Sequence, residues 1–412
     1  MISRRSTFKA AAGVAAAATL GGRAARAEDK VLKIGINLSF TGADAESAAR
    51  IANGAVIAFE EANAAHTVKG YTFQLVKLDD ATATAGQYDP AQAATNARTM
   101  VSDRGYVAAL GPQMSGAGKA MAPILSQGNL AIITPSSTNP DLTDPKFAAQ
   151  YRPAGKAIYF RTVATDAFQG PNMANYMADT LKVKTIYILD DSGAYGVGLA
   201  DAFQGQAEKK GVKVLGRDRL DPKAADYASV LTKIKALNPQ ALYYGGVGQA
   251  GVKLAKQAYE IIPSMIKAGG DGMQSADLLK GAGFPAVEGW YATVASPHVT
   301  EDPKTSKFSD RFFARFKIRP DDYTITCYTG AQVIIEAAKS LAATGKTIDR
   351  STMRDAIQTV KLTDSLIGPL EFDGNGDLKN KVISVFKITK DGTKPLDDPG
   401  AQYKYVGVAP MA

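Results

Sequence analysis

The sequence predicts an α/β protein of two similar lobes, each built on a parallel sheet. Apolar runs of strand length alternate with helical segments along most of the chain, which is typical of parallel sheets covered by helices. The chain has 412 residues, of which 45% are hydrophobic and 21% charged. At about 150 residues per domain, this length predicts two or three folding units with their own cores. A disordered or fibrous chain is excluded.

The expected strands fall into two successive sets, at about 30–150 and about 180–290. They are residues 31–38, 72–78, 107–110, 131–134, 185–189, 212–215 and 241–244. Apolar residues at helical spacing predict helices between them, at 53–64 and 225–237. Because both sets repeat the same order of elements, we expect one lobe from each.

The last part of the chain, from residue 301, is too short and mixed for a third lobe. The expected elements are helices at 306–315 and 329–341, a strand from 368, a tight turn at 373–377 and a returning strand at 382–388. We expect this tail to complete both lobes. The chain then crosses between the lobes more than once, and the crossings form a hinge.

Residues 1–27 are typical of an export signal. The pair Arg4-Arg5 precedes an Ala-rich apolar run and a cleavage site at Ala27, which favours the Tat route. The apolar run is too short for a membrane span of about 20 residues, and a frayed N-terminal helix is the alternative. Cleavage removes five basic residues and no acidic one, which lowers the formal charge from +8 to +3. That charge is too small for nucleic-acid binding. The export signal predicts a soluble mature chain outside the cytoplasm, in the periplasm.

The side-chain inventory excludes several kinds of site. The single cysteine, Cys327, allows no intrachain disulfide and no cysteine-rich metal site, and we expect it in the core. The two histidines, His66 and His298, are too far apart in sequence to predict a metal site. Residues 373–377 imitate the start of a calcium loop but lack its later Gly and Glu, which favours a plain turn. We therefore expect no cofactor and no metal.

One glycine-rich segment matches a cofactor-binding pattern. Residues 246–251 have the sequence Gly-Val-Gly-Gln-Ala-Gly and follow an expected strand, as in the dinucleotide fingerprint GxGxxG. The segment lies deep in the chain, and no acidic residue clearly ends the next strand. A plain strand-to-helix turn is therefore the alternative to an NAD site.

A second glycine-rich segment, residues 111–119, is similar to a phosphate loop at first sight. Gln113 and Ala120 stand where a Walker A loop needs Gly and Ser or Thr, so nucleotide binding is not expected. The segment still predicts a helix start at which Ser115 and free backbone N–H groups can hold an anion. The alternative is a turn that caps only its own helix.

Several segments together resemble one family. They are residues 33–42, 79–80, 110–118, 134–143, 160–162, 195–198, 243–246 and 270–272. In this order and spacing, nearly the whole mature chain resembles the periplasmic substrate-binding proteins of the branched-chain amino acid class of ABC importers. The resemblance implies a type I binding protein, with two lobes joined by a three-strand hinge. The expected lobes are 28–162 with 295–367, and 163–294 with 368–412.

The resemblance also implies how an amino acid is held. Its carboxylate is expected at Ser115 and Thr138, with Gly116 in the same glycine-rich turn. The Ser136 carbonyl and the Asp271 carboxylate are expected to take the ammonium. The chemistry agrees, because hydroxyl and N–H groups suit a carboxylate while a carboxylate with a carbonyl suits a cation. The structural alternatives are turn caps for Ser136 and Thr138 and a solvated turn residue for Asp271.

Three further residues complete the predicted site. Tyr195 is expected to close over the ligand, while Phe40 and Val247 are expected to line its side-chain pocket. Core or surface packing is the alternative for both aromatic residues. Leucine-binding members of the family carry aromatic residues where this chain has Val247 and Gly248, which leaves the ligand's identity open and allows one larger than leucine.

The expected function is capture of a small amino acid or related carboxylate, without catalysis, and its delivery to an ABC permease in the inner membrane. We expect a monomer that binds no nucleic acid. Three alternatives stay open. The same fold can bind an aromatic or aliphatic acid or an amide, it can serve as a ligand sensor, or the chain is an exported NAD-dependent oxidoreductase.

Overall fold

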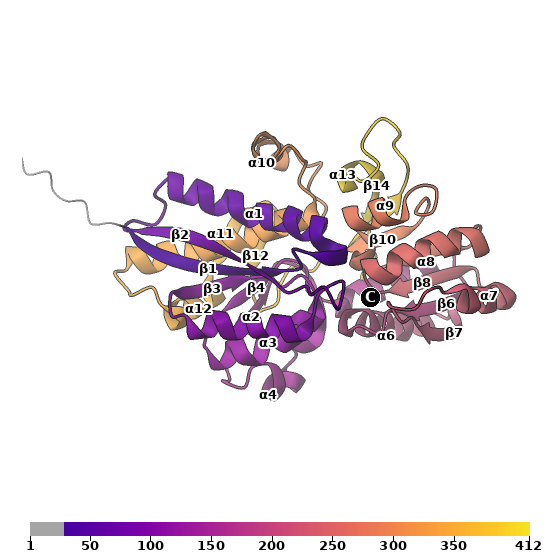
Figure 1. Ribbon diagram of the computed structural model, residues 1–412, viewed down its shortest axis with the longest axis horizontal. Coiled ribbons are helices and arrows are strands. Elements are labelled where there is room, and N and C mark those ends of the chain that lie inside the picture. Colours follow the sequence, from indigo (N-terminus) through magenta and orange to yellow (C-terminus); the bar gives the residue numbers. More distant parts are fainter. Residues whose placement is uncertain (1–28) are drawn as a thin grey trace, which may run out of the picture.

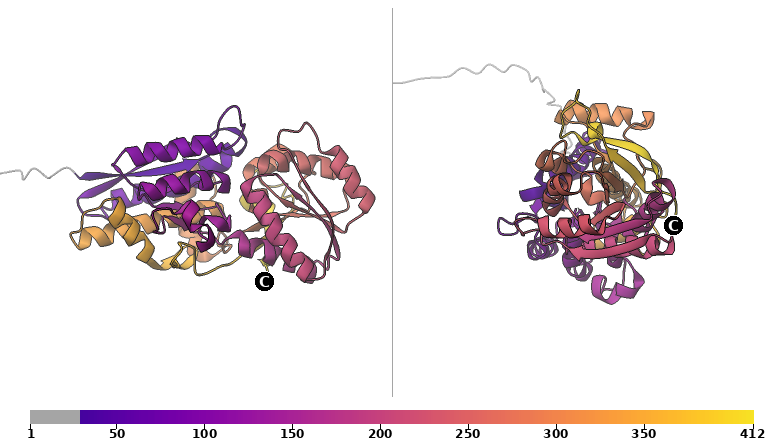
Figure 2. Two further views of the ribbon diagram at one scale, coloured as in Figure 1. Left: turned by 90° about the horizontal axis from the view of Figure 1, so that it is seen from below. Right: turned by 90° about the vertical axis from the view of Figure 1, so that its right-hand side faces the viewer.

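The computed structural model describes residues 29–412, and the predicted signal at 1–27 lies outside them. Two lobes lie along the long axis of the molecule, the first in indigo and purple and the second in red (Figures 1 and 2). The orange and yellow C-terminal part contributes to both lobes. The predicted two-lobe α/β fold is therefore confirmed.

The first lobe contains a five-stranded parallel sheet in the order β2-β1-β3-β4-β5. Its strands are β1 (Lys30–Leu38), β2 (Tyr71–Asp79), β3 (Tyr106–Leu110), β4 (Ile132–Thr134) and β5 (Tyr159–Arg161). Its helices from the first half of the chain are η1 (Gly42–Asp44), α1 (Ala45–Ala64), α2 (Pro90–Ser102), α3 (Ser115–Gln127), η2 (Pro140–Leu142), η3 (Pro145–Phe147) and α4 (Ala148–Tyr151). The four expected strands are confirmed to within one residue at each end. β5 was not expected, because its three residues end in Arg161 and form no apolar run.

The second lobe contains a seven-stranded sheet in the order β14-β13-β10-β9-β8-β6-β7. Its strands are β6 (Thr185–Asp190), β7 (Lys213–Arg219), β8 (Ala241–Gly245), β9 (Ile266–Gly269), β10 (Tyr291–Val294), β13 (Ser384–Ile388) and β14 (Tyr403–Val408). Its helices are α5 (Asp166–Asn175), η4 (Tyr176–Thr180), α6 (Ala194–Lys209), α7 (Ala228–Leu237), α8 (Gly248–Ile261), η5 (Asp271–Met273), α9 (Ala276–Ala282) and α13 (Pro399–Gln402). The strands from β6 to β10 are parallel, whereas β13 and β14 join antiparallel.

The C-terminal helices return to the first lobe. They are α10 (Pro303–Phe316), α11 (Asp322–Ala343) and α12 (Arg350–Thr359), followed by the hairpin of β11 (Lys361–Ser365) and β12 (Gly368–Glu371). α11 starts with a capping box between Asp321 and Thr324, which fixes its first turn. It packs closely on α1 because Gly54 has no side chain; a Cβ there would clash with the Thr324 carbonyl oxygen.

One expectation for the tail is wrong. The segment from 368 was expected to pair with 382–388, but β12 pairs with β11, and β13 pairs with β10 and β14. The tight turn does form, since Phe372 bridges to Leu378. Arg161 holds Asp377 on the first lobe with a 2.7 Å ion pair, and the segment that follows joins the second sheet as β13. The boundary expected at 367/368 thus falls between two paired strands, and the chain crosses after Leu378.

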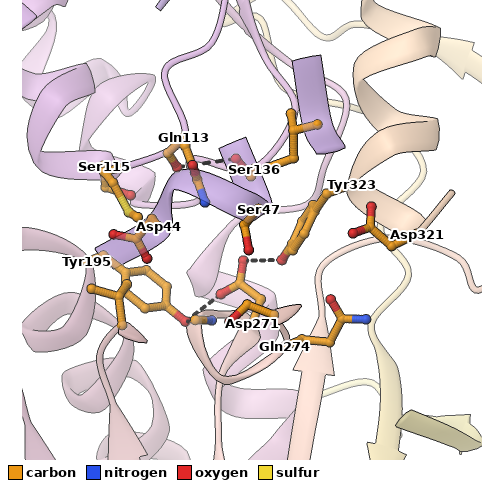
Figure 3. Close-up of a pocket in the computed structure, with 15 residues that line it drawn as sticks. Asp44, Ser47, Gln113, Ser115, Ser136, Tyr195, Asp271, Gln274, Asp321 and Tyr323 are labelled. Atoms are coloured by element: carbon orange, nitrogen blue, oxygen red, sulfur yellow. Dashed lines mark hydrogen bonds between the residues drawn. The ribbon is translucent and has the colours of Figure 1, made fainter. Parts of the chain in front are cut away.

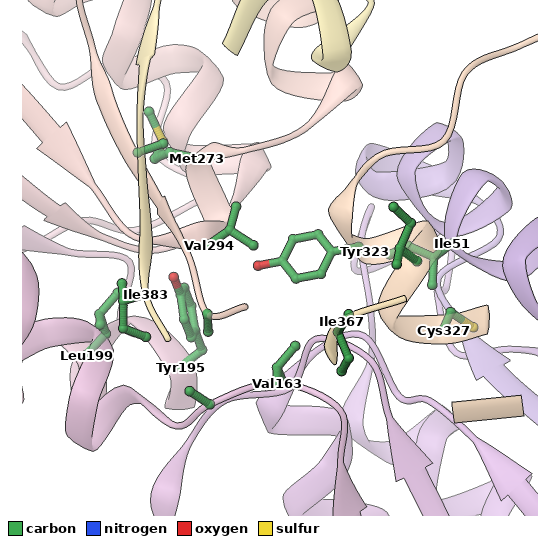
Figure 4. Packing of buried hydrophobic residues seen from close by; sticks show 14 of the residues in the cluster. Ile51, Val163, Tyr195, Leu199, Met273, Val294, Tyr323, Cys327, Ile367 and Ile383 are labelled. Atoms are coloured by element: carbon green, nitrogen blue, oxygen red, sulfur yellow. The ribbon is translucent and has the colours of Figure 1, made fainter. Parts of the chain in front are cut away.

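Three crossings join the lobes, at about 162–165, 295–302 and 379–383. The Ala164 N–H donates to the Ala295 carbonyl at 2.7 Å, and the Ser384 hydroxyl donates to the Ser296 carbonyl at 2.7 Å. Val163, Val294 and Ile383 are buried beside these crossings (Figure 4). The three segments are therefore packed and bonded to one another.

The carboxyl ends of the parallel strands in both sheets lead to the region between the lobes. This is the edge of a parallel sheet at which ligands bind in open α/β folds. Cys327 is buried in α11, as expected, and burial raises the pKa of its thiol to about 12. Within residues 29–412, no helix combines the length and apolar character needed to cross a membrane.

Candidate functional site

A cavity of about 580 Å³, counting the solvent at its mouth, lies between the lobes (Figure 3). Except for Ile51 in the second turn of α1, each residue that lines it lies at or near the start of a helix or in a loop that follows a strand. They are Asp44, Ser47, Ile51, Gln113, Met114, Ser115, Ser136, Tyr195, Val247, Asp271, Gly272, Gln274, Ser275, Asp321 and Tyr323. Five of the eight predicted site residues are among them: Ser115, Ser136, Tyr195, Val247 and Asp271.

The glycine-rich turn after β3 opens α3 directly at the cavity. Gly111 has φ +88°, and a Cβ there would clash with the Asn37 carbonyl, so the turn requires glycine. No side chain within the described residues caps α3, and its first backbone bond runs from the Gly118 N–H to the Met114 carbonyl. The three preceding N–H groups therefore lack helical acceptors. The predicted helix start at Ser115 is confirmed.

Ser115 has a hydroxyl suited to donate into the cavity. Its Oγ accepts hydrogen bonds from the Asn139 N–H at 3.2 Å and from the Ser137 hydroxyl at 3.4 Å. Because both contacts use its lone pairs, its own hydrogen remains available. Gly116 does not line the cavity; it lies under Tyr88, whose hydroxyl would be 2.6 Å from an added Cβ.

The loop after β4 brings Ser136 to the cavity but not Thr138. Thr134 holds the loop, since its Oγ1 accepts from the N–H groups of Ser136 at 3.2 Å and Ser137 at 2.8 Å. The Ser136 hydroxyl donates to the Gln113 carbonyl at 3.2 Å. Thr138 is fully buried behind the lining, and its carbonyl accepts from the Asp166 N–H at 2.9 Å.

Asp271 follows β9 and is 6% exposed. Its carboxylate accepts from the hydroxyls of Tyr195 and Tyr323, the latter at 2.6 Å, and from Gln169 Nε2 at 3.1 Å. Burial raises the pKa of Asp271 above its ordinary value. Burial and the negative charge of Asp271 raise the pKa of neighbouring Asp166 to about 8. The site therefore contains a buried carboxylate surrounded by neutral donors and a second acid.

Polar contacts tie the two lobes together around the cavity. Tyr323 of α11 reaches Asp271 from the first lobe. Asn139 Nδ2 donates to the Ala194 carbonyl at the start of α6, at 2.8 Å. Asp277 of α9 accepts from the Ser47 N–H at 2.9 Å and so caps α1 across the lobes. The structure thus has the lobes closed on the cavity.

The two remaining predicted residues differ in position. Val247 lines the cavity at the start of α8, where its N–H donates to Asp191 at 3.0 Å. Phe40 is half-buried outside the lining, with Lys77 Nζ 5.3 Å from the centre of its ring. Gly246 and Val247 form the turn between β8 and α8, and residues 248–251 begin α8, as in the strand-to-helix turn given above as the alternative to a dinucleotide site.

Sequence reasoning missed several lining residues. They are Asp44, Ser47, Ile51, Gln113, Met114, Gly272, Gln274, Ser275, Asp321 and Tyr323. Gln113 and Met114 adjoin the predicted Ser115, and Gly272 to Ser275 adjoin Asp271, so extending each turn by a few residues would have found them. Asp44 and Tyr323 have no such local signal.

Comparison with known proteins identifies the family. The family model described as "Periplasmic binding protein" matches residues 31–393. The chain belongs to the periplasmic binding protein family. Its sequence is 28% identical over 380 residues to the "Leu/Ile/Val-binding protein homolog 3" of Brucella melitensis biotype 1, covering 92% of this chain and 97% of the relative.

Solved structures agree with this assignment at the level of the fold. The leucine-binding protein LivK of Thermotoga maritima MSB8 has a TM-score of 0.77 to this periplasmic binding protein, with 24% identity, and the match covers 92% of this chain and 98% of that one. A solute-binding protein of an ABC transporter from R. palustris, in complex with benzoate, has a TM-score of 0.76 with 18% identity, covering 93% and 97%. The family is one of non-enzymatic solute-binding proteins, so the oxidoreductase alternative is excluded.

Proposed function

We propose that this periplasmic binding protein captures an amino acid between its lobes and delivers it to an ABC permease in the inner membrane. One observation carries the proposal. The uncapped start of α3 on the first lobe and the buried Asp271 on the second face the same cavity. One end suits an anion and the other a cation, as a zwitterion requires.

The ligand carboxylate is held at the start of α3. The N–H group and the hydroxyl of Ser115 donate to it, and the partial positive charge of the helix start adds to their effect. Gly116, outside the lining, supports this turn without contacting the ligand. Thr138 lies behind the lining and supports the loop that carries Ser136. Its contribution to binding is therefore indirect.

The ligand ammonium is held by Asp271 and the Ser136 carbonyl. Asp271 is 6% exposed, so a charge-assisted hydrogen bond to it is shielded from water and strong. Tyr195 contacts the ligand from α6 and orients the Asp271 carboxylate, while Val247 borders the ligand's side chain. Phe40, outside the lining, makes no contact in this arrangement.

Binding shifts the two-lobe equilibrium toward closure. The open state offers one lobe's contacts and the closed state offers both, so a ligand that uses both ends favours the closed state. Release follows when the permease favours the open state. We further propose that the protein is exported through the signal at 1–27 by the Tat route and acts as a monomer, and that its lobes move about the three crossings.

A second candidate function is the binding of an aromatic or aliphatic acid that lacks an amino group. The observation that favours it is the set of three neutral donors on Asp271, two tyrosines and Gln169, which satisfies this carboxylate without an ammonium. The R. palustris relative binds benzoate by its own description. An acid of this kind would use the α3 end of the cavity alone.

The test is a thermal-shift screen of residues 28–412, followed by isothermal titration calorimetry of every compound that stabilises the protein. The panel contains the common amino acids, benzoate, 4-hydroxybenzoate and short aliphatic acids. Amino acids are expected to stabilise the protein and to bind one per chain. Saturable binding of the acids with no response to any amino acid would establish the second function and refute the first.

A further inference from the structure

The lining of the cavity carries unbalanced negative charge. Three carboxylates contribute to it, those of Asp44, Asp271 and Asp321, whereas none of its fifteen residues is a Lys, Arg or His. In Figure 3, Asp271 lies between Asp44 on one side and Gln274 with Asp321 on the other. One ammonium group on a ligand would neutralise only one of these three negative charges.

Several of the buried acceptors also lack hydrogen-bond partners. Among the described residues, no donor reaches Asp44 Oδ2, Gln274 Oε1 or Ser47 Oγ. These side chains are 4%, 6% and 8% exposed, so water reaches them poorly. Because buried polar groups are nearly always paired in folded proteins and these three side chains line the cavity, a ligand there is placed to pair them.

The charges near Asp44 do not neutralise it. Its pKa is raised to about 7 by burial first, and then by the negative charges of Asp277, Asp80 and Asp191. It makes no capping bond to α1, the helix that it precedes. A positively charged ligand group is the partner that this carboxylate lacks.

The contacts of the α1 cation Arg50 are with groups other than Asp44. Its Nη1 donates to the Arg319 carbonyl at 2.8 Å, and its other nitrogens lie 3.7 Å from Glu46 and 3.9 Å from Asp321. Arg50 is 5% exposed and does not line the cavity. From outside the cavity, Arg50 therefore offsets part of the negative charge of Asp321. It forms no ion pair with Asp44.

An aliphatic side chain would fit this lining poorly. Ile51, Met114 and Val247 provide an apolar part of the wall, but a leucine side chain would also cover Asp44 and Gln274 without donating to them. Each buried acceptor left unpaired costs about tenfold or more in affinity. The cavity therefore favours a side chain that combines an apolar stem with a donor group at its end.

We infer that the ligand is a basic amino acid, whose second cationic group binds the Asp44 carboxylate. The inference rests on the proposed function, because it assumes that the first ammonium and the carboxylate bind as described there. Lysine and arginine have the required form, since each has an apolar stem that ends in a cation with several N–H donors.

The test compares ligands that differ only in the second charge. L-Norleucine has the carbon skeleton of L-lysine without the terminal ammonium, and L-citrulline replaces the guanidinium of L-arginine by a neutral group of the same shape. Calorimetry with residues 28–412 is expected to give a dissociation constant at least about tenfold lower for the cationic member of at least one pair. Asp44→Asn is expected to remove most of that preference by weakening the cationic ligand, without weakening norleucine.

Asp226→Asn serves as the matched control, because Asp226 is exposed on the second lobe and caps Ala228 at 3.0 Å, a bond that Asn also makes. It should keep the wild-type preference. If norleucine or leucine binds as tightly as lysine, and citrulline as tightly as arginine, the basic ligand is wrong while amino-acid binding stands. If Asp44→Asn keeps the full preference for the cation, the assignment to Asp44 is wrong. If no amino acid binds, the proposed function itself fails.

Discussion

Replacement of Asp271 by asparagine tests the cation end of the cavity. The substitution keeps the shape of the side chain and removes its charge. Loss of one partner from a buried, hydrogen-bonded charge pair costs about 2–5 kcal/mol, which corresponds to a dissociation constant about 30-fold to several thousandfold higher for an amino acid. The upper part of this range is expected because Asp271 is 6% exposed and solvent screening is weak.

The stability of the unliganded Asp271→Asn protein is expected to change much less than its affinity. Removal of the charge relieves the cost of burying it beside Asp166, whose pKa is raised to about 8, but it also weakens the bonds from Tyr195 and Tyr323. These effects oppose each other. Chemical denaturation measures the stability and calorimetry the affinity, with Asp226→Asn as control. An amino acid that binds Asp271→Asn as tightly as the wild type would refute the pairing of its ammonium with Asp271.

Three other predictions follow from the packing and charges. Asp277→Ala removes the cap on the Ser47 N–H across the lobes and should weaken ligand binding by about 2- to 30-fold in calorimetry, although Asp277 does not contact the ligand. Lys280→Gln breaks only an exposed pair with Glu46 at 3.5 Å and should have a smaller effect. Equal affinities for the wild type and both variants would contradict this role of Asp277. Gly54→Ala should lower the free energy of unfolding by about 1–3 kcal/mol or more, because α1 and α11 leave no room for a Cβ. Gly205→Ala in α6, where a Cβ meets nothing within 4 Å, should raise it by about 0.5–1 kcal/mol. Equal free energies of unfolding for the two variants in urea denaturation would contradict this. Folding raises the pKa of Asp166 from 3.8 to about 8. The folded state therefore keeps a proton that the unfolded state has lost, and stability falls as pH rises between these values. The free energy of unfolding of the wild type relative to Asp166→Asn should decrease from pH 5 to pH 8, and a difference that does not change with pH would show that Asp166 does not titrate in this way.

The fold could be predicted from the sequence because its strands are apolar runs separated by helices of clear period. The same logic located much of the cavity. Ser115, Ser136, Val247 and Asp271 each follow a strand closely, and the carboxyl ends of parallel strands meet at one edge. Short strands that contain a charged residue escaped detection, since Arg161 in β5 and Lys267 in β9 interrupt the apolar run.

The residues that were missed reach the cavity through tertiary structure. Tyr323 comes from α11, which begins only after the chain has crossed back to the first lobe, and it meets Asp271 across 52 positions of sequence. Asp44 lies at the junction of η1 and α1, where an acid usually indicates a helix cap. Phe40 follows β1 just as Ser115 follows β3, but its ring lies beside Lys77 outside the cavity. Side-chain direction in a loop is set by packing, which the sequence pattern does not contain.

The most direct measurement uses three forms of one ligand. The amino acid that stabilises residues 28–412 most strongly is compared in calorimetry with its deaminated acid and its decarboxylated amine. Because α3 and Asp271 hold opposite ends of a zwitterion, both shortened compounds are expected to bind at least about 30-fold more weakly than the amino acid. If either one binds as tightly as the intact amino acid, the two-ended grip between the lobes is wrong.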